Sequence, residues 1–424
     1  MPPTRRYTRP SAPARTALPF TATPRHDAAG PVAAAGASGI IAGTTALIRR
    51  CRHRNRQPAA ATGSSTAGAV VMLHYLPDSL YVRNRLTQSS DLEIWLSAGE
   101  KQRRQARARS HFHDPQPVCP PQHEQDPFLA LPWAYAQLQW LTTRLLDHDD
   151  SEQQLRALAG SLRRLANHAP EATLAAGLLL PYAHYAHAHA VHVALLVARL
   201  TQRLAQPEAE CESLVCAALT MNIAMVNLQQ QLSHQAEALS SLQAKQLHLH
   251  PLASSAMLRE VGIDDEIWHL AILEHHEQWN GKGYPFGLPR GKISPGAHLL
   301  HVADVAMARL HPRHYRRPQL PKSAMVQLFQ QRDTLADAKL ADCLIKEVGL
   351  YPPGSFVKLE QGDTAIVVQH GDDITTPLTV RFGRDANIVP SASRIASPAQ
   401  MTVEARHLPA LARLWQCRVD SPAG

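Results

Sequence analysis

The clearest pattern in the chain is a series of apolar positions at helical spacing that begins near residue 133. Leucines recur three or four residues apart in two runs, first Leu138, Leu141 and Leu145, then Leu155, Leu158, Leu162 and Leu165. This periodicity predicts two amphipathic helices between Trp133 and Ala169. Their apolar faces either form a homodimer interface or cover the domain that follows.

Residues 173 to 348 continue as one helix after another. The segment "HAHAVHVALLVARLTQRLA" places His189, Val193 and Val197 on one stripe. Further helices are expected over "ECESLVCAALTMNIAMV", "EIWHLAILEHHEQW" and "GAHLLHVADVAMARL". The helix "ASSAMLREVG" is expected to follow His250, with Pro251 in its first turn.

The residue composition changes after Leu350. The segment "GSFVKLEQGDTAIVVQHGDDITTPLTVRF" is rich in β-forming residues and is broken at Gln-Gly-Asp and Gly-Asp-Asp. It predicts a small β module of three or four strands within residues 349–410. The fold class is therefore mainly α, a helical bundle with a small C-terminal β module.

Residues 1–71 are rich in Pro, Ala, Gly and Ser and show no amphipathic period, which predicts a disordered tail. The stretch "PVAAAGASGIIAGTTALI" is long enough to cross a bilayer, but its small residues give a weak driving force, so we expect no firm membrane segment. The Arg-rich start also resembles a transit peptide. The simpler alternative is that translation begins at Met72. Residues 72–172 then form an N-terminal helical and linker region.

The net charge of +8 comes from this tail. Residues 1–71 hold ten arginines, no lysine and one acid, Asp27, so they carry +9 and leave about −1 on the remainder. A near-neutral body gives no electrostatic reason to expect DNA as a partner. The six cysteines contain no CxxC pair, which indicates reduced thiols in a cytoplasmic protein.

One short segment carries most of the candidate chemistry. "LEHHEQWNGKGYPFGL", residues 273–288, joins two adjacent histidines, an acid and a glycine-rich turn. Histidines and an acid at the ends and inner faces of successive helices can converge on a metal. Imidazole suits Fe, Mn or Zn, and glycines allow the backbone to approach a ligand closely.

This segment resembles the HD-GYP family, bacterial cyclic di-GMP phosphodiesterases of the wider HD superfamily. The resemblance covers roughly residues 175–350 and includes "HPLASSAML", "LLHVADVAMARL" and "RHYRRP" in the same order. The later "YPPGSFVKLEQGDTAIVV" is similar to a β tail found in some relatives. The resemblance implies an HD-type helical bundle and a metal-dependent phosphohydrolase.

Metal ligands carry over by position. The resemblance assigns this role to His189, His250, His275, His276 and Asp304. The first position has neighbours of the same type at residues 184, 187 and 192, and His189 is chosen because it shares a helix face with Val193. Tyr185 stands where some members carry a further acidic ligand. The histidines can also be read as buried structural residues.

The chain departs from the family at its defining His-Asp pair. The family's helix ends roughly as AALLHDIGK, whereas this chain reads "AALTMNIAM". Met221 replaces the histidine, Asn222 the aspartate that bridges two metals, and Met225 the lysine. A thioether is a poor ligand for Fe(II), Mn(II) or Zn(II), and a neutral amide is a poor bridge. We therefore expect one divalent metal (Fe, Mn or Zn), or none.

The substrate side of the motif is largely present. The resemblance places Gly283, Tyr284 and Pro285, together with Arg313 and Arg316, near the ligand. Guanidinium groups suit phosphate oxygens, although these arginines and Arg317 can equally form an exposed basic turn. Glu277 is expected to orient a histidine from the second shell.

Three functional hypotheses follow. The first is a degenerate signalling module that binds cyclic di-GMP, or a partner protein such as a diguanylate cyclase, with little or no hydrolysis. The second is an active cyclic di-GMP phosphodiesterase with an atypical metal site. The third is a structural adaptor that binds no ligand, so the sequence leaves enzymatic activity open.

Overall fold

The computed structural model describes residues 116–145, 150–311, 320–330, 338–382, 388–391, 394–399, 401 and 403–418. The expected tail, residues 1–71, and most of the expected linker region lie outside these residues. So do the arginines at positions 313, 316 and 317. In the described part, helices dominate and the strands follow residue 355, which confirms the predicted fold class.

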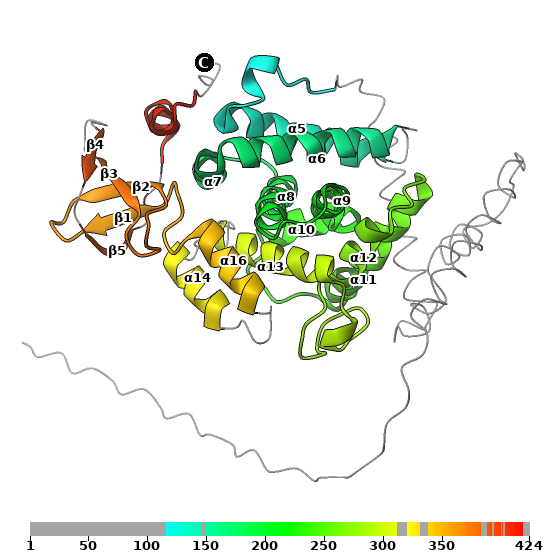
Figure 1. The fold of residues 1–424 in the computed structure, drawn as a ribbon. Coiled ribbons are helices and arrows are strands. Elements are labelled where there is room, and N and C mark those ends of the chain that lie inside the picture. The colour runs from blue at the N-terminus through cyan, green and yellow to red at the C-terminus, as the bar shows by residue number, and fades with distance from the viewer. Residues whose placement is uncertain are drawn as a thin grey trace, which may run out of the picture. The chain divides into compact units, whose positions relative to one another are not determined.

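The helices follow one another along the chain (Figure 1). They are α5 (Pro127–Arg144), α6 (Ser151–His168), α7 (Pro170–Leu179), α8 (Tyr185–Arg203), α9 (Glu208–Thr220), α10 (Val226–Leu232), α11 (Ser241–Glu260), α12 (Glu266–Glu274), α13 (Pro295–Leu310), α14 (Pro321–Gln330), α16 (Ala338–Val348) and α17 (Leu408–Ala412). A 3₁₀ turn, η3 (Ile223–Met225), connects α9 to α10.

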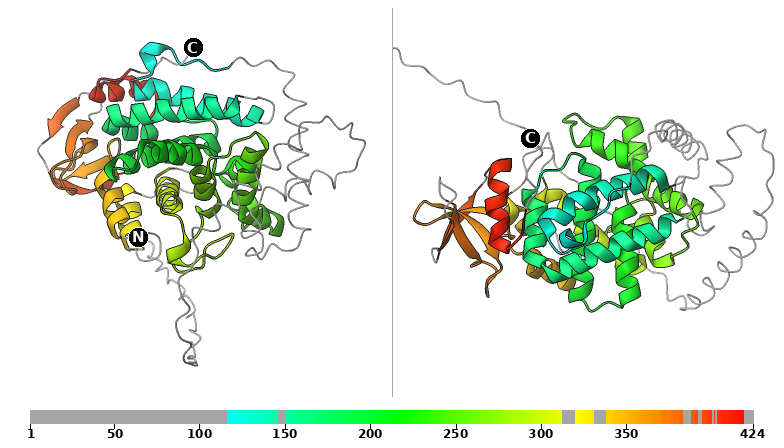
Figure 2. Two further views of the ribbon diagram at one scale, coloured as in Figure 1. Left: turned by 45° about the vertical axis from the view of Figure 1, so that its right-hand side comes forward. Right: turned by 90° about the horizontal axis from the view of Figure 1, so that it is seen from above.

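Helix α8 is the central element of the bundle. It packs against α5, α6, α9, α10, α13 and α16, and Figures 1 and 2 show these helices around it. Most of its residues are buried on every side, including His187, His189 and His192. A helix that is buried all round belongs to the interior of a domain, so polar side chains on α8 need partners inside the protein.

The predicted leucine-rich pair corresponds to α5 and α6. Leu155, Leu158 and Leu162 of α6 are buried within this chain and share one core with α8 and α9. The leucine stripe therefore covers the bundle rather than remaining free for a second copy. The boundary expected between residues 172 and 173 falls inside α7, whose Ala172 and Ala175 are buried in that same core.

Local capping defines the helices that carry the candidate site. Ser240 and Gln243 form a capping box at the start of α11. The carboxylate of Asp265 accepts a hydrogen bond from the Trp268 N–H at the start of α12, and Ser294 caps α13 through the Ala297 N–H. These caps fix where each helix begins and hence which residues lie at its ends.

The prediction for Pro251 was wrong. Helix α11 begins ten residues earlier, at Ser241, and Pro251 lies in its interior. A proline in a helix interior removes one helical hydrogen bond. For this reason the sequence favoured Pro251 at the start of a helix. The capping box at Ser240 and the burial of Leu249 and Leu252 outweigh this cost.

One stretch of the described residues, Glu208–Leu232, is long and apolar enough to cross a membrane. Its most apolar window is 78% buried inside the protein. Helix α9, which forms most of it, packs against α6, α8 and α12. The stretch therefore has the environment of a core helix.

The β module is an antiparallel sheet with the strand order β4-β3-β2-β1-β5. Its strands are β1 (Phe356–Leu359), β2 (Thr364–Gln369), β3 (Leu378–Phe382), β4 (Ile388–Ser391) and β5 (Ile395–Ala399). We expected three or four strands. The additional strand β5 lies beyond the alternating segment and pairs with β1 at the edge, where Pro398 is tolerated.

The sheet attaches to the bundle through one face. Phe356, Ile366 and Val380 are register partners on adjacent strands, and all three belong to the same core as the helices. Val357 and Val367 point to the other face and pack with Tyr351.

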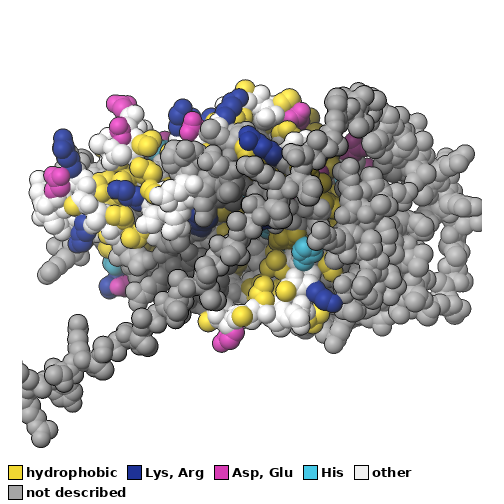
Figure 3. Space-filling model, turned by 90° about the horizontal axis from the view of Figure 1, so that it is seen from below, with side chains coloured by type: hydrophobic (Ala, Val, Ile, Leu, Met, Phe, Trp, Pro, Cys, Tyr) yellow, Lys and Arg dark blue, Asp and Glu magenta, His cyan; other side chains and the backbone are white. Residues whose placement is uncertain are grey.

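On the described part of the surface in Figure 3, basic and acidic side chains are interspersed rather than separated by sign.

Helices α8 and α16 are joined by a buried carboxylate. Glu347 is 3% exposed, and its two oxygens lie 2.5 Å from Arg199 Nε and 2.9 Å from Arg203 Nε. Glu347→Gln removes the charge and places an amide N–H₂ opposite one guanidinium. We expect urea unfolding to show a loss of about 1–3 kcal/mol, because a buried donor is left unsatisfied.

The matched control is Glu404→Gln, which breaks the exposed Glu404–Arg406 pair. Exposed pairs contribute little, so this variant should stay within about 0.5 kcal/mol of the wild type. Equal losses in the two variants would contradict a structural role for the buried carboxylate.

Candidate metal centre

Three histidines from two helices meet at the end of the bundle. His250 belongs to α11, and His275 and His276 follow the last residue of α12. One ligand atom from each lies within 4.8 Å of those of the other two. The Nε2 atoms of His250 and His275 are 3.3 Å apart. The structure thus brings together three of the five predicted metal ligands.

The orientation of His250 follows from the proline beside it. Pro251 has no N–H to donate to the carbonyl oxygen of Leu247, four residues earlier. That oxygen lies 2.5 Å from His250 Nδ1 and accepts its hydrogen bond instead. In the His-Pro dipeptide, the proline leaves the Leu247 carbonyl free and the histidine donates a hydrogen bond to it. This dipeptide is a sequence signal for the orientation of His250 that was not recognised from the sequence.

His275 is held in a similar way by the end of α12. Its Nδ1 lies 2.6 Å from the carbonyl oxygen of Ile272. The last carbonyls of a helix lack intrahelical partners and are free to accept side-chain donors. Because a carbonyl only accepts, Nδ1 carries the hydrogen in both His250 and His275, and both Nε2 atoms present lone pairs.

This arrangement fits a metal ion. Two lone pairs that face each other at 3.3 Å repel unless a cation or a proton lies between them. Burial lowers the pKa of His250 to about 3 and that of His275 to about 4, and it holds the pKa of His276 well below its usual range. The rings therefore stay neutral near pH 7 and can serve Fe, Mn or Zn as nitrogen ligands.

The other two predicted ligands form a pair. His189 Nε2 on α8 donates a hydrogen bond to Asp304 Oδ1 on α13, over 2.7 Å. Burial would raise the pKa of Asp304, but the bond from His189 and the nearby histidines outweigh it and lower this pKa to about 2. Asp304 is also close enough to His250 and His275 to interact electrostatically with both. The other α8 histidines do not make this contact.

The positions that depart from the family pattern lie at the end of α9. Met221 is fully buried and caps that helix, and Asn222 directly precedes η3 as its N-cap residue. Asn222 is 6% exposed, and its amide oxygen has no hydrogen-bond partner in the part of the chain that the structure describes. A neutral amide carbonyl, unpartnered among the described residues, therefore lies at the position where the family resemblance expects the bridging aspartate.

The partners of Glu277 in the structure differ from the one expected. We expected its carboxylate to orient a histidine, but it accepts hydrogen bonds from the backbone N–H groups of Phe286, Gly287 and Leu288 at 2.7, 3.1 and 2.8 Å. Backbone carbonyls orient the histidines instead. Glu277 lies directly after His276, so it ties the glycine-rich loop to the histidine pair.

The same loop places an aromatic ring against the site. The Tyr284 ring stacks between His276 and His248, with centroids 4.5 and 4.9 Å away, and its backbone N–H binds the His276 carbonyl. Pro285 follows through a cis peptide bond. A Cβ on Gly283 would lie 2.3 Å from the backbone nitrogen of Gln278, so only glycine allows this approach.

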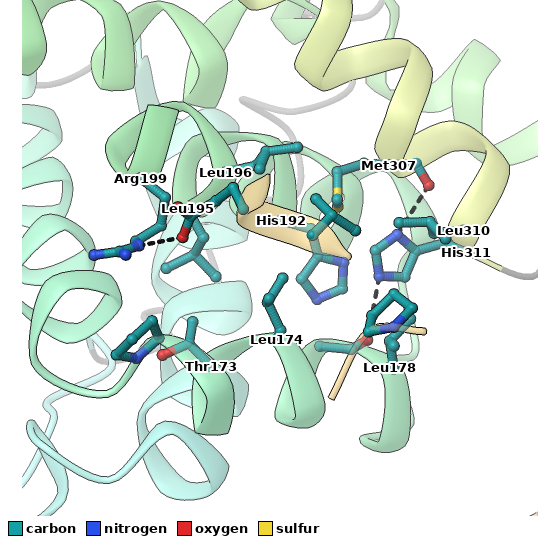
Figure 4. A pocket seen from close by; sticks show the side chains of 15 residues that line it. Thr173, Leu174, Leu178, His192, Leu195, Leu196, Arg199, Met307, Leu310 and His311 are labelled. Atoms are coloured by element: carbon teal, nitrogen blue, oxygen red, sulfur yellow. Dashed lines mark hydrogen bonds and ion pairs between the residues drawn. The ribbon is translucent and has the colours of Figure 1, made fainter. Parts of the chain in front are cut away.

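The remaining histidines of α8 face another part of the core. His192 Nε2 and the Tyr135 hydroxyl share a hydrogen bond of 2.6 Å, and the His192 ring stacks on His311 with centroids 4.0 Å apart. His187 Nε2 shares a hydrogen bond with the Thr142 hydroxyl. Figure 4 shows His192 and His311 lining a cavity of about 30 Å³. This volume holds about one water molecule, so the cavity is too small for a nucleotide.

Comparisons with known proteins show what the chain is similar to. Residues 144–340 match the HD domain family. The chain is 27% identical over 227 residues to a cyclic di-GMP phosphodiesterase of Pseudomonas aeruginosa, which covers 53% of this chain and 55% of that protein. It is 36% identical over 81 residues to a cyclic di-GMP phosphodiesterase response regulator of Xanthomonas campestris pv. campestris, which covers 19% and 21%.

Among solved structures, an HDG"Y"P protein from Bdellovibrio bacteriovorus matches with a TM-score of 0.45 and 17% identity. That match covers 58% of this chain and 76% of the other. The chain spans about half the length of the Pseudomonas relative and about a fifth of the Xanthomonas relative.

Replacing Pro251 should change stability and metal affinity in opposite directions. Pro251→Ala restores an N–H that competes for the Leu247 carbonyl, so the helix gains a bond and His250 loses its anchor. We expect the metal-free protein to be more stable by about 1–3 kcal/mol in urea unfolding. Calorimetric titration with Zn(II) should show affinity weakened about tenfold or more.

Pro132, inside α5, supplies the matched control because it lies in a helix that carries none of the site. Pro132→Ala should leave metal affinity unchanged. An unchanged affinity in Pro251→Ala as well would mean that the proline does not orient His250.

Stability of the metal-free protein should fall as the solution becomes acidic. In the unfolded chain His250 and His275 protonate near pH 6.5, whereas in the folded chain they resist protonation down to about 3 and 4. Their contribution is therefore complete above about pH 6.5 and is lost as the pH falls from there to about 4 for His275 and about 3 for His250, at up to about 1.4 kcal/mol per pH unit for each ring. Urea unfolding at pH 7.5, 6 and 5 measures the slope, which His250→Asn should reduce. An identical slope in that variant would contradict the burial of a neutral His250.

Proposed function

We propose that the chain, whose residues 144–340 match the HD domain family, belongs to the HD-GYP group and is a cyclic di-GMP signalling protein of the cytoplasm. In this proposal the domain binds cyclic di-GMP, or a protein partner such as a diguanylate cyclase, and performs little or no hydrolysis. It holds at most one divalent metal, through His250, His275 and His276.

The observation that carries this proposal is the shortage of negative charge. Two divalent ions about 4 Å apart repel by roughly 16 kcal/mol at an effective dielectric constant of about 20, so paired metal sites need anionic ligands between them. Asp304 is the carboxylate that interacts with the histidine cluster, and His189 already occupies one of its oxygens. Asn222 brings a neutral amide where the bridging anion would stand.

The alternative is an active phosphodiesterase with an atypical site. The three histidines support it, because a divalent cation held there would polarise a phosphate oxygen. The chain's own residues would contribute positioning: the stacked Tyr284 and the loop held by Glu277 form one wall beside the histidines. Asp304, ionised at neutral pH, accepts the hydrogen bond from His189 Nε2 and so fixes the orientation of that ring.

Nucleotide binding is proposed to involve the glycine-rich loop. Tyr284 offers an aromatic face next to His276, and the exposed backbone near Gly281 and Lys282 leaves room for close approach. Arg313 and Arg316, outside the described residues, remain proposed phosphate partners because guanidinium groups match phosphate oxygens.

Two measurements on the full chain test the proposal together. Calorimetry should detect binding of cyclic di-GMP, and incubation with Mn(II) or Fe(II) should yield no more pGpG or GMP than a protein-free control. Product formation that disappears in His275→Ala would replace the proposal with the enzyme alternative. Absence of binding, with Arg313→Ala also silent, would leave the ligand-free adaptor.

Restoring the family pair should restore a second metal. In the double variant Met221→His and Asn222→Asp, the new carboxylate supplies the missing bridge. We expect bound Mn(II) to rise from one equivalent to two and nucleotide turnover to rise on the order of a hundredfold or more. The same variant carrying His275→Ala is the control and should lose both gains. Two equivalents of metal in the wild type would contradict the proposed charge shortage.

A further inference from the structure

His301 is a buried histidine that no family resemblance assigned to the site. It lies on α13 one turn before Asp304 and is 4% exposed. Its Nδ1 lies 2.7 Å from the backbone carbonyl oxygen of His275. Since the carbonyl only accepts, Nδ1 carries the hydrogen and Nε2 carries a lone pair.

The Nε2 atom of His301 has no hydrogen-bond partner within the described ranges. A buried acceptor without a donor is costly, about 1–3 kcal/mol, and such atoms in native proteins usually have a partner such as a water or an ion. A bound cation would remove this cost. The unpartnered atom is therefore an independent sign of a ligand.

His301 also follows the arrangement of the cluster beside it. His250, His275 and His301 each donate Nδ1–H to a backbone carbonyl, which leaves each Nε2 free. His301 interacts electrostatically with His275 and His276 as well as with Asp304. Three and four residues along a helix share a face, so His301 and Asp304 lie on the side of α13 that meets the site.

We propose that His301 is a further ligand of the metal held by His250, His275 and His276, and that its Nε2 completes a four-nitrogen site. This inference rests on the proposed metal centre and adds a residue to it. His301 falls outside the group whose ligand atoms all lie within 4.8 Å of one another, so the proposal requires its ring to move toward the other three on metal binding.

The fourth imidazole has a functional consequence. Catalytic zinc sites keep one position for water, whereas structural sites fill all four with protein ligands. With His301 bound, the ion has four neutral donors and no protein position for an attacking water. The chain thus uses a metal to fix the end of α12 against α11 and α13, which suits a binding module better than a hydrolase.

The test measures coordination rather than turnover. Metal-free full-length protein is titrated with Co(II), and the visible absorption of the bound ion reports its geometry. Wild type should give the intense bands of a four-coordinate ion. His301→Ala should weaken and shift these bands, raise the Kd about tenfold or more, and recover the wild-type spectrum when free imidazole fills the vacated space.

His269→Gln is the matched control. His269 is another buried histidine, on α12, but its two nitrogens contact Ser255 Oγ and the Ile263 carbonyl, away from the site. This variant should keep the wild-type Co(II) spectrum and Kd even where it lowers stability. X-ray absorption of the Zn(II)-loaded wild type adds a measurement that needs no variant, and four coordinated imidazoles are expected.

The outcomes separate the inference from the proposed function. Unchanged bands and Kd in His301→Ala, or three imidazoles on zinc in the wild type, would overturn the role of His301 and leave the three-histidine centre intact. Failure of the wild type to bind Co(II), Zn(II) or Mn(II) would overturn the metal centre itself and this inference with it.

Discussion

The candidate centre depends on one repeated interaction, the hydrogen bond from an imidazole Nδ1–H to a backbone carbonyl that its helix leaves free. Pro251 frees the carbonyl of Leu247, and the end of α12 frees that of Ile272. Each bond fixes a tautomer and directs the opposite nitrogen inward. The lone pairs of these rings converge as a result, an arrangement that fits a divalent cation.

Charge decides what such a centre can do. Neutral histidines can bind one divalent ion, but a pair of ions needs bridging anions, and among the described residues Asp304 is the carboxylate that interacts electrostatically with the cluster. Asp304 is committed to His189, and the buried Asn222 contributes only a dipole. The limited negative charge around the cluster is thus the basis of the proposal that the domain binds a ligand rather than hydrolyses it, and the Tyr284 ring lies stacked on His276 beside the cluster.

Sequence reasoning was reliable where the signal is local. Helical periodicity predicted the bundle, and β-forming runs predicted the C-terminal module. The segment from His275 to Gly287 carried the resemblance to the HD-GYP family. Sequence reasoning failed where contacts in the folded protein outweighed or replaced what a local sequence rule predicts. Pro251 was expected at a helix start because the loss of one helical hydrogen bond can be read from the sequence. The burial of its neighbours Leu249 and Leu252, which outweighs this loss, cannot. Glu277 read as a partner for a histidine, but a loop nine to eleven residues ahead folds back to use both of its oxygens.

The available residue types are readable from the amino-acid sequence: histidines at positions 250, 275 and 276, one acid inside an apolar run, and an amide and a thioether where the resemblance expects the His-Asp pair. Their partners depend on how the helices pack. This packing joined His189 to Asp304 across 115 positions and brought His301 beside His275, although a single histidine in an apolar helix looks structural in sequence. The physical reason is that ligand geometry depends on where helices cross and which carbonyls remain free, and neither quantity is encoded in the spacing of residues along one helix.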